Sequence, residues 1–315
     1  MTIILENFVG IDVSKDSLDV AVLGQKYVEQ VENSKKGIAS LVAKLRQISP
    51  TLIVVEATGG YEEALVLGLF EAGLPVALVS PQRVRQYARA RGILAKTDEI
   101  DAHNLADFGK NIHPRLFVAK TEDGRHLSGL MTRRRQVEEM LKSEKNRRRT
   151  AYPELLSSIE TVVICLQGES KRLDDEIREF LETHSDFKVQ EKLLRSAKSV
   201  GLITAATLLA ELPELGKLDR KKIAALVGVA PMNQDSGRRR GYRKTKGGRP
   251  DVRSVLYMST LNGIRFNPLI KSQYEHLLAR GKEKKVAITA CMRKFLTILN
   301  AMVRDQQPFR MPKAA

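Results

Sequence analysis

Residues 7–24, NFVGIDVSKDSLDVAVLG, decide the fold of the amino-terminal part of this 315-residue chain. Residues 7–13 predict a strand and residues 18–24 a second one, because apolar and β-branched residues flank a short polar turn at 14–16. A third short strand is predicted at 27–31. Strands joined this closely pair as a hairpin, so we expect at least part of the sheet to be antiparallel.

The segments that follow alternate between helix and strand. Ile38, Leu41 and Leu45 recur with the period of a helix, and the run TLIVV at 51–55 is typical of a buried strand. The predicted elements are a helix at 36–47, a strand at 51–55, a helix at 61–72, a strand at 75–79 and a helix that begins near Pro81. This order predicts an α/β domain whose mixed sheet is covered by helices.

Beyond residue 115 the apolar pattern is helical. Two long, charged helices at about 120–150 and 154–183 predict an antiparallel hairpin or coiled-coil arm, and a mostly α carboxyl-terminal domain follows. In that domain SVGLITA (199–205) is similar to a helix-hairpin-helix turn, which presents backbone N–H groups to phosphate, with Ser199 where glycine is common. The predicted domains are 1–115, 116–190 and 191–315.

Charge is divided unevenly along the chain, whose net charge is +16. Residues 1–110 hold 12 Lys and Arg against 14 Asp and Glu, whereas residues 111–315 hold 41 against 23. Such a split indicates a polyanion-binding region beside a near-neutral domain, and we expect nucleic acid as the polyanion. The cations assigned to it are Arg133, Arg134, Arg135, Arg147, Arg148, Arg149, Arg238, Arg239, Arg240, Arg243, Lys244, Lys246 and Arg249.

Other protein classes fit the composition poorly. Two cysteines, Cys165 and Cys291, argue against a disulfide scaffold and a cysteine-based zinc site. The first ten residues lack the basic region of a secretory signal, and the apolar run at 199–210 is too short to span a bilayer. A membrane surface is the weaker alternative to nucleic acid, because the basic tract at 237–250 has no apolar helical face. We therefore expect a cytoplasmic protein without a membrane partner.

Four acids of the near-neutral domain form a candidate metal site. Asp12 lies inside an apolar strand, Glu56 ends a buried one, and Asp98 and Asp101 share one face of a predicted helix. This is the arrangement of an RNase H-like nuclease, in which two Mg²⁺ ions roughly 4 Å apart assist phosphodiester cleavage. Each acid alone is more often structural; the four together, beside a basic region, favour a catalytic role.

A serine in the basic region is the second candidate. Ser236 precedes Gly237 in a positively charged segment, where a hydroxyl can reach a phosphate and arginines can stabilise the charge of the transition state. From spacing alone a turn or capping serine is the commoner interpretation. Tyr242 and Tyr257 are rival nucleophiles, although Tyr257 falls in a predicted apolar helix.

The chain resembles the DEDD-type insertion-sequence transposases, which include Piv-like DNA invertases and bridge-RNA-guided serine recombinases. The resemblance covers almost the entire chain. It is carried by VGIDVSKDSLDVAV (9–22), VVEATGGYE (54–62), AKTDEIDAHNLADF (95–108), LLAELPELG (208–216), AALVGVAPMNQDSG (224–237), GGRPDVRSVLYM (247–258), FNPLI (266–270) and LTILNAMVRD (296–305).

The resemblance implies a RuvC-like nuclease domain, a coiled-coil linker and a transposase domain. It carries the family's metal-binding catalytic acids over to Asp12, Glu56, Asp98 and Asp101 and its nucleophile to Ser236. It further implies a homo-oligomer, a dimer or tetramer, in which the acids of one subunit meet the serine of another. Donor and target DNA would be joined through a phosphoserine intermediate, with a structured guide RNA encoded by the element.

Two other functions stay open from the sequence. A structure-selective endonuclease, such as a junction resolvase, would use the four acids but not Ser236. A non-catalytic DNA- or RNA-binding protein with a degenerate nuclease domain would use neither, and the presence of all four acids argues against it.

Overall fold

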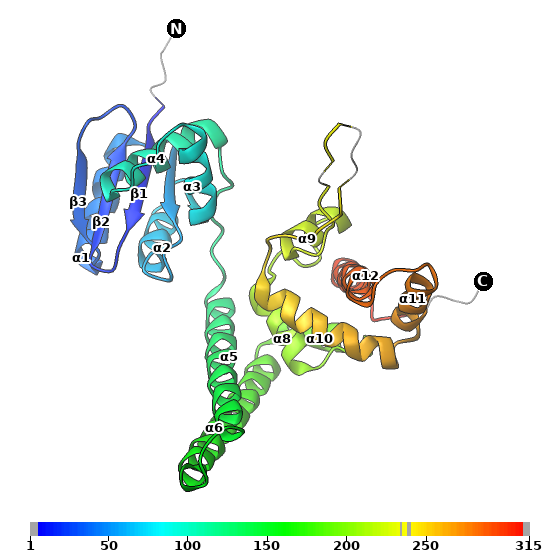
Figure 1. The fold of residues 1–315 in the computed structure, drawn as a ribbon. Coiled ribbons are helices and arrows are strands. Elements are labelled where there is room, and N and C mark those ends of the chain that lie inside the picture. The colour runs from blue at the N-terminus through cyan, green and yellow to red at the C-terminus, as the bar shows by residue number, and fades with distance from the viewer. Residues whose placement is uncertain (1–5, 234, 238–240, 311–315) are drawn as a thin grey trace. The chain divides into compact units, whose positions relative to one another are not determined.

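The computed structural model describes residues 6–233, 235–237 and 241–310 (Figure 1). The chain divides into two compact units, unit 1 at Met1–Ala119 and unit 2 at Lys120–Ala315. Each unit has hydrophobic clusters of its own, formed by residues of that unit alone. We therefore describe them separately.

Unit 1 is built on a five-stranded mixed sheet. Its strands are β1 (Phe8–Val13), β2 (Ser17–Val22), β3 (Val28–Glu32), β4 (Leu52–Glu56) and β5 (Val76–Val79). The strand order is β3-β2-β1-β4-β5, with β1, β2 and β3 antiparallel and β1, β4 and β5 parallel. The predicted hairpin and mixed sheet are confirmed, and the topology is RNase H-like.

Helices cover both faces of this sheet. They are α1 (Lys35–Ile48), α2 (Glu63–Glu71), α3 (Pro81–Ala90) and α4 (Asp98–Ile112). Helices α1 and α2 pack on the face that carries Val9 and Ile11, whereas α3 and α4 pack on the face that carries Phe8. Since side chains alternate along a strand, Asp12 of β1 belongs to the same face as Phe8 and therefore to the side of α4.

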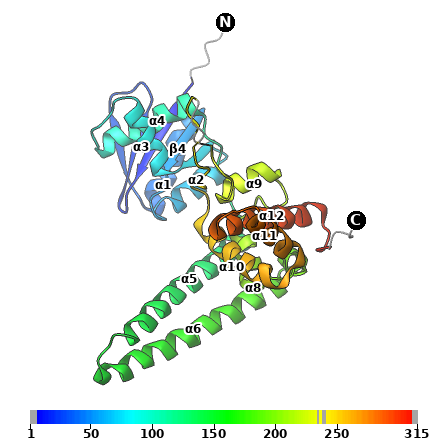
Figure 2. The same cartoon turned by 45° about the vertical axis from the view of Figure 1, so that its right-hand side comes forward.

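Unit 2 begins with a long antiparallel helix pair. Helix α5 (Glu122–Arg148) and helix α6 (Leu156–Thr183) lie side by side and are joined by a short 3₁₀ turn at Pro153–Leu155 (Figure 2). Leu127 and Val137 of α5 pack against Leu173 and Ile177 of α6 in one apolar cluster. The predicted helical arm is thus present.

The remainder of unit 2 is helical. Its helices are α7 (Ser185–Arg195), α8 (Leu202–Glu211), α9 (Arg220–Val227), α10 (Pro250–Phe266), α11 (Pro268–Ala279) and α12 (Lys284–Asp305). By length and composition α12 could cross a membrane, and among the described helices it alone meets that test. However, Phe295, Leu296 and Leu299 of α12 are fully buried in the core of unit 2, so α12 is the central core helix of this unit.

Candidate active site

The sheet of unit 1 places two of the predicted acids on adjacent parallel strands. Ile11 of β1 is in register with Val55 of β4, and Asp12 and Glu56 are the next residue of each strand. Both carboxylates are only half-buried, and the Asp12 Oδ1 accepts a hydrogen bond of 3.1 Å from the backbone N–H of Val13. The two acids thus lie where neighbouring strands end.

Helix α4 supplies the other two acids from its first turn. The hydroxyl of Thr97 accepts a hydrogen bond of 3.2 Å from the backbone N–H of Ile100 and caps the helix. Asp98 and Asp101 then lie near the positive end of the helix dipole, which stabilises negative charge. Asp101 is half-buried, and Asp98 is exposed.

Gly10 allows α4 to lie directly on β1. A Cβ at this position would come within 2.1 Å of the backbone oxygen of Ala102 and 2.4 Å of the backbone nitrogen of Ala106. Any larger residue would therefore have to displace the helix. Because Gly10 and Asp12 share one face of β1, this close packing also carries Asp101 towards Asp12.

The electrostatics show that the acids act on one another. Burial, followed by the charges of Asp101 and Asp98, raises the pKa of Asp12 to about 6. Burial likewise raises the pKa of Glu56 to about 7, together with the charges of Asp12 and Asp101. Burial also raises the pKa of Asp101, which Lys96 and Arg85 oppose. The predicted acids therefore form one electrostatic cluster.

The chemistry of this donor set suits a hard cation. Its donor atoms are carboxylate oxygens, the ligands that Mg²⁺ prefers, and a cation would offset the burial and the mutual repulsion that raise the pKa values of Asp12 and Glu56. Over the described ranges, no three His, Cys, Asp or Glu residues are grouped closely enough to hold a metal ion. The residues thus fit the ion by chemistry and charge, while metal ligation stays a prediction.

Two polar residues beside the cluster, Asp19 and Gln30, were not predicted from the sequence. Asp19 of β2 is the register partner of Asp12 and is only 7% exposed, and its carboxylate accepts a hydrogen bond of 3.0 Å from Gln30 of β3. A polar row, Asp12–Asp19–Gln30, therefore crosses three strands. The signal was the position of Asp19 in the alternating strand SLDVAV, seven residues after Asp12.

Arg85 and Lys96 are cations whose charges act on the acids. The charge of Lys96 opposes the rise in the pKa values of Glu56 and Asp101, and that of Arg85 opposes the rise for Asp101. The Arg85 guanidinium donates hydrogen bonds to the backbone oxygens of Leu94 (3.1 Å) and Ala95 (3.5 Å). Arg85 thereby fixes the segment that leads from α3 to the first turn of α4. No sequence pattern indicated this role, because Arg85 binds backbone atoms.

Ser236 lies in unit 2 on a loop between α9 and α10. Its side chain is exposed, and the two sides of the loop are joined by an isolated β-bridge between Met232 and Lys244. Beside Ser236, the Asp235 carboxylate accepts hydrogen bonds from the Arg243 guanidinium (2.5 Å) and the Gly241 N–H (3.2 Å). The hydrogen bond from Arg243 holds the pKa of Asp235 below its ordinary value. Asp235 is therefore a brace of the loop.

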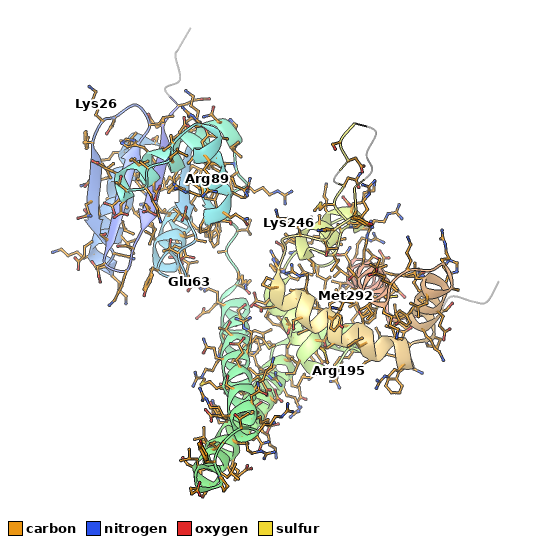
Figure 3. The ribbon with its side chains drawn as sticks, in the orientation of Figure 1. Lys26, Glu63, Arg89, Arg195, Lys246 and Met292 are labelled. Atoms are coloured by element: carbon orange, nitrogen blue, oxygen red, sulfur yellow. The ribbon has the colours of Figure 1, made fainter. Side chains whose placement is uncertain are left out.

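Many of the predicted nucleic-acid-binding cations already have partners within unit 2. Ion pairs join Arg134 to Asp174, Arg135 to Asp251, Arg147 to Glu144, Arg148 to Glu160, Arg243 to Asp235 and Arg249 to Glu214. Arg133 donates a hydrogen bond to Gln136, whereas Arg149, Lys244 and Lys246 are exposed. Figure 3 shows Lys246 at the base of the Ser236 loop. Arg238, Arg239 and Arg240 lie outside the described residues.

Arg249 has the most specific of these contacts. Its guanidinium binds both carboxylate oxygens of Glu214, at 2.7 and 2.6 Å, and donates a further hydrogen bond of 2.5 Å to the backbone oxygen of Glu211. These bonds connect the start of α10 to the end of α8. Arg249 thus has a structural function, and its predicted contact with nucleic acid remains untested.

Ser199 occupies the turn between α7 and α8 with a φ of 85°, a conformation that favours glycine. Its hydroxyl is buried and has no hydrogen-bond partner among the described residues. Its backbone oxygen accepts a hydrogen bond of 2.6 Å from Ser259 of α10. The backbone here is therefore that of a glycine position, occupied by serine.

Comparisons with known proteins identify the family. A family model described as Transposase matches residues 9–155, and a second, described as Transposase IS116/IS110/IS902 family, matches residues 191–275. The chain belongs to this transposase family. The two matches include the four acids and Ser236. A transposase of this family cleaves and recombines DNA, so the chain is an enzyme whose substrate is DNA.

Full-length relatives agree with this assignment. The transposase is 26% identical to the pilin gene-inverting protein of Moraxella lacunata, a match that covers 96% of this chain and 98% of the relative. It is 22% identical to the transposase of insertion sequence IS1111A from Coxiella burnetii, over 96% of this chain and 90% of that one. Among solved structures, T. thermophilus RuvC bound to a Holliday junction matches 36% of the transposase and 99% of that chain, at 19% identity and a TM-score of 0.29.

Proposed function

We propose that this transposase joins DNA strands through a phosphoserine at Ser236, assisted by Mg²⁺ ions held by Asp12, Glu56, Asp98 and Asp101. One observation carries the metal-assisted part: burial, together with the neighbouring carboxylates of β1 and α4, raises the pKa values of Asp12 and Glu56. Two Mg²⁺ ions would supply Lewis-acid stabilisation of the negative charge that develops on the phosphate oxygens.

The serine supplies the covalent step. The Ser236 Oγ attacks a backbone phosphorus, the Oγ–P bond forms, and the bridging P–O bond to a deoxyribose breaks. The released deoxyribose oxygen takes up the proton that Ser236 gives up. In the second step the deoxyribose hydroxyl of another strand attacks the phosphoserine, which restores the serine and rejoins DNA without hydrolysis. The exposure of Ser236 on a braced, basic loop supports this role.

The partners follow from the same chemistry. Strand exchange requires two DNA duplexes, donor and target, and at least two subunits to hold them, so we propose a dimer or tetramer in which the acids of one subunit act with Ser236 of another. The positive charge of residues 111–315 also supports a structured guide RNA of the element as a partner. These reactions would take place in the cytoplasm.

Trapping of the covalent intermediate tests this function. The wild-type transposase is incubated with Mg²⁺, element-end DNA and RNA transcribed from the element flanks, and protein–DNA adducts are separated on a denaturing gel. We expect an adduct for the wild type, none for Ser236→Ala, and an undiminished one for the control Ser272→Ala, which alters a serine on α11 outside the proposed site. We also expect Asp12→Asn to abolish the adduct.

The same gel distinguishes the alternative enzyme. If Ser236→Ala still cuts DNA at the wild-type rate and leaves free phosphate ends, while Asp12→Asn does not cut, the enzyme is a metal-dependent endonuclease and the phosphoserine is refuted. If both variants retain full activity, the assignment of the acids fails as well.

A further inference from the structure

A basic groove lies beside the Ser236 loop within unit 2. It has a volume of about 740 Å³ and is formed by the start of α9, both sides of the Ser236 loop and one side of α12. Seven of the described residues that line the groove are Lys or Arg, and no Asp or Glu is among the described lining residues. Residues between 220 and 245 and the distant helix α12 thus contribute to one cationic surface.

Most of this charge is available to a ligand. Arg220 of α9 and Lys285 of α12 are exposed, and Arg293 of α12 is half-buried. In the part of the chain that the structure describes, none of these three has a carboxylate within salt-bridge distance; the ion pairs near the groove are those of Lys222 and Arg243. Unpaired cations that converge on one groove create a strong positive potential.

The floor of the groove is apolar and hydroxyl-bearing. Val286 and Ala290 of α12 line the groove among the cations of that helix, and Val229, which follows α9, lines it as well. Val286 is 52% exposed, which is unusual for valine on a core helix. Thr289 and Thr297 add hydroxyl groups that can bind phosphate or the edge of a base.

We propose that this groove binds single-stranded DNA, with phosphates on the cations and an unstacked base on the apolar floor around Val286. The volume matches pockets that hold a drug-sized ligand, hence one or two nucleotides; a duplex is far too wide to enter. A cationic groove that follows the backbone is usual in single-strand sites. Here Val286 and Ala290 take the place of the aromatic side chains on which bases commonly stack.

The groove is partly formed by the loop that carries Ser236. Arg243, Lys244 and Thr245 line the groove and belong to the side of the loop opposite Ser236. A strand bound here would be the stretch of DNA that leads to, or away from, the phosphate that Ser236 attacks. The choice of DNA over RNA rests on the proposed function, whereas the groove itself and its charge do not.

Tryptophan fluorescence can detect the base directly, because the chain contains no Trp. Val286→Trp places the only indole in the groove, and Phe266→Trp, at an exposed position near the end of α10, is the control. Both are made with Ser236→Ala, so that binding is read without chemistry. A mixed-sequence 12-nucleotide DNA single strand is titrated. We expect saturable quenching of the indole fluorescence in Val286→Trp that is at least threefold greater than in Phe266→Trp.

Charge reversal provides the independent test. Lys285→Glu with Arg293→Glu is compared with Arg265→Glu and Lys282→Glu, which make the same charge change away from the groove. By fluorescence anisotropy the groove pair should weaken single-strand binding at least tenfold. The slope of the logarithm of the binding constant against the logarithm of the salt concentration should become shallower by about 1.4, which is about 0.7 for each lost phosphate contact. The control pair should change binding less than threefold. Arg220→Glu with Lys221→Glu repeats the test from α9 if the α12 pair does not fold.

The outcomes separate this proposal from the proposed function. Equal weakening by the groove and control pairs, or no quenching of the groove tryptophan, refutes the groove as a site. Tighter, groove-dependent binding of RNA of the same sequence refutes DNA as the occupant. All these measurements, the charge-reversal series included, are made in the Ser236→Ala background, so a failure of phosphoserine chemistry leaves the expected binding unchanged.

Discussion

The burial of the ionised Asp12 carboxylate beside other acids should destabilise the metal-free transposase, and Asp12→Asn should remove this cost. Asparagine keeps the shape of aspartate and can still accept the hydrogen bond from the Val13 N–H, so the substitution removes charge and little else. We expect Asp12→Asn to raise the stability of unit 1 at pH 8 in the presence of a chelator.

The magnitude follows from the pKa of Asp12. A rise from 3.8 to about 6 corresponds to about 3 kcal/mol of lost stability once the carboxylate is ionised. Since the side chain is only half-buried, solvent screening reduces this to about 1 kcal/mol. For a domain of this size that is a rise of about 4 °C in Tm.

The pH dependence has a definite sign. The folded state binds the Asp12 proton more tightly than the unfolded state does. The contribution of Asp12 to stability therefore falls as pH rises from about 4 to about 6 and is constant above that range. Glu56 extends the decline to about pH 7. Asp12→Asn should therefore gain most over the wild type at pH 8 and very little at pH 4.

Calorimetry with and without Mg²⁺ measures both effects. Hydrogen exchange of the β1 and β4 peptides assigns the change to unit 1. The matched control is Asp16→Asn, which removes the same charge from an exposed turn residue on the same hairpin. Mg²⁺ should stabilise the wild type and Asp16→Asn, and should stabilise Asp12→Asn much less. If Asp12→Asn melts at or below the temperature of Asp16→Asn in chelator at pH 8, the ionised Asp12 carboxylate does not destabilise the fold and the reasoning is wrong.

Three further substitutions test the packing around the two sites. Gly10→Ala should cost about 3 kcal/mol and abolish recombination, because its Cβ would meet the backbone of α4, whereas Gly129→Ala in the open middle of α5 should raise Tm slightly; equal Tm values would contradict this. Ser199→Gly should stabilise unit 2 by roughly 1 kcal/mol in urea unfolding, since it removes a strained φ and a buried, unpaired hydroxyl; a loss of stability would show that the turn is not strained. Arg249→Gln should lower Tm by a few degrees because it breaks the paired contact with Glu214, and Lys246→Gln, at an exposed position, should not.

The sequence was sufficient where the signal is local. Short apolar and β-branched runs located all five strands of unit 1, and an acid inside such a run marked Asp12 as exceptional. The two long helices followed from spacing alone. Glu56 was recognisable because it ends a buried apolar strand, and Asp98 and Asp101 because their i, i+3 spacing places them on one face of a helix.

Signals that depend on distant residues were not readable. Arg134 pairs with Asp174 and Arg249 pairs with Glu214 across separations of 40 and 35 residues. The sequence alone therefore did not show that these arginines already have carboxylate partners. The groove beside Ser236 is likewise formed by three separate segments. Gly10 could not be distinguished from an ordinary strand glycine until the position of α4 was known.

The central claim is that Ser236 carries DNA during the reaction. Mass spectrometry of the trapped adduct, after nuclease and protease digestion, locates the attachment to a single residue. We predict a nucleotide remnant on Ser236, formed with Mg²⁺ and absent from Asp12→Asn. A remnant on Tyr242 or another residue, or DNA cleavage with no remnant on the protein, would contradict the claim.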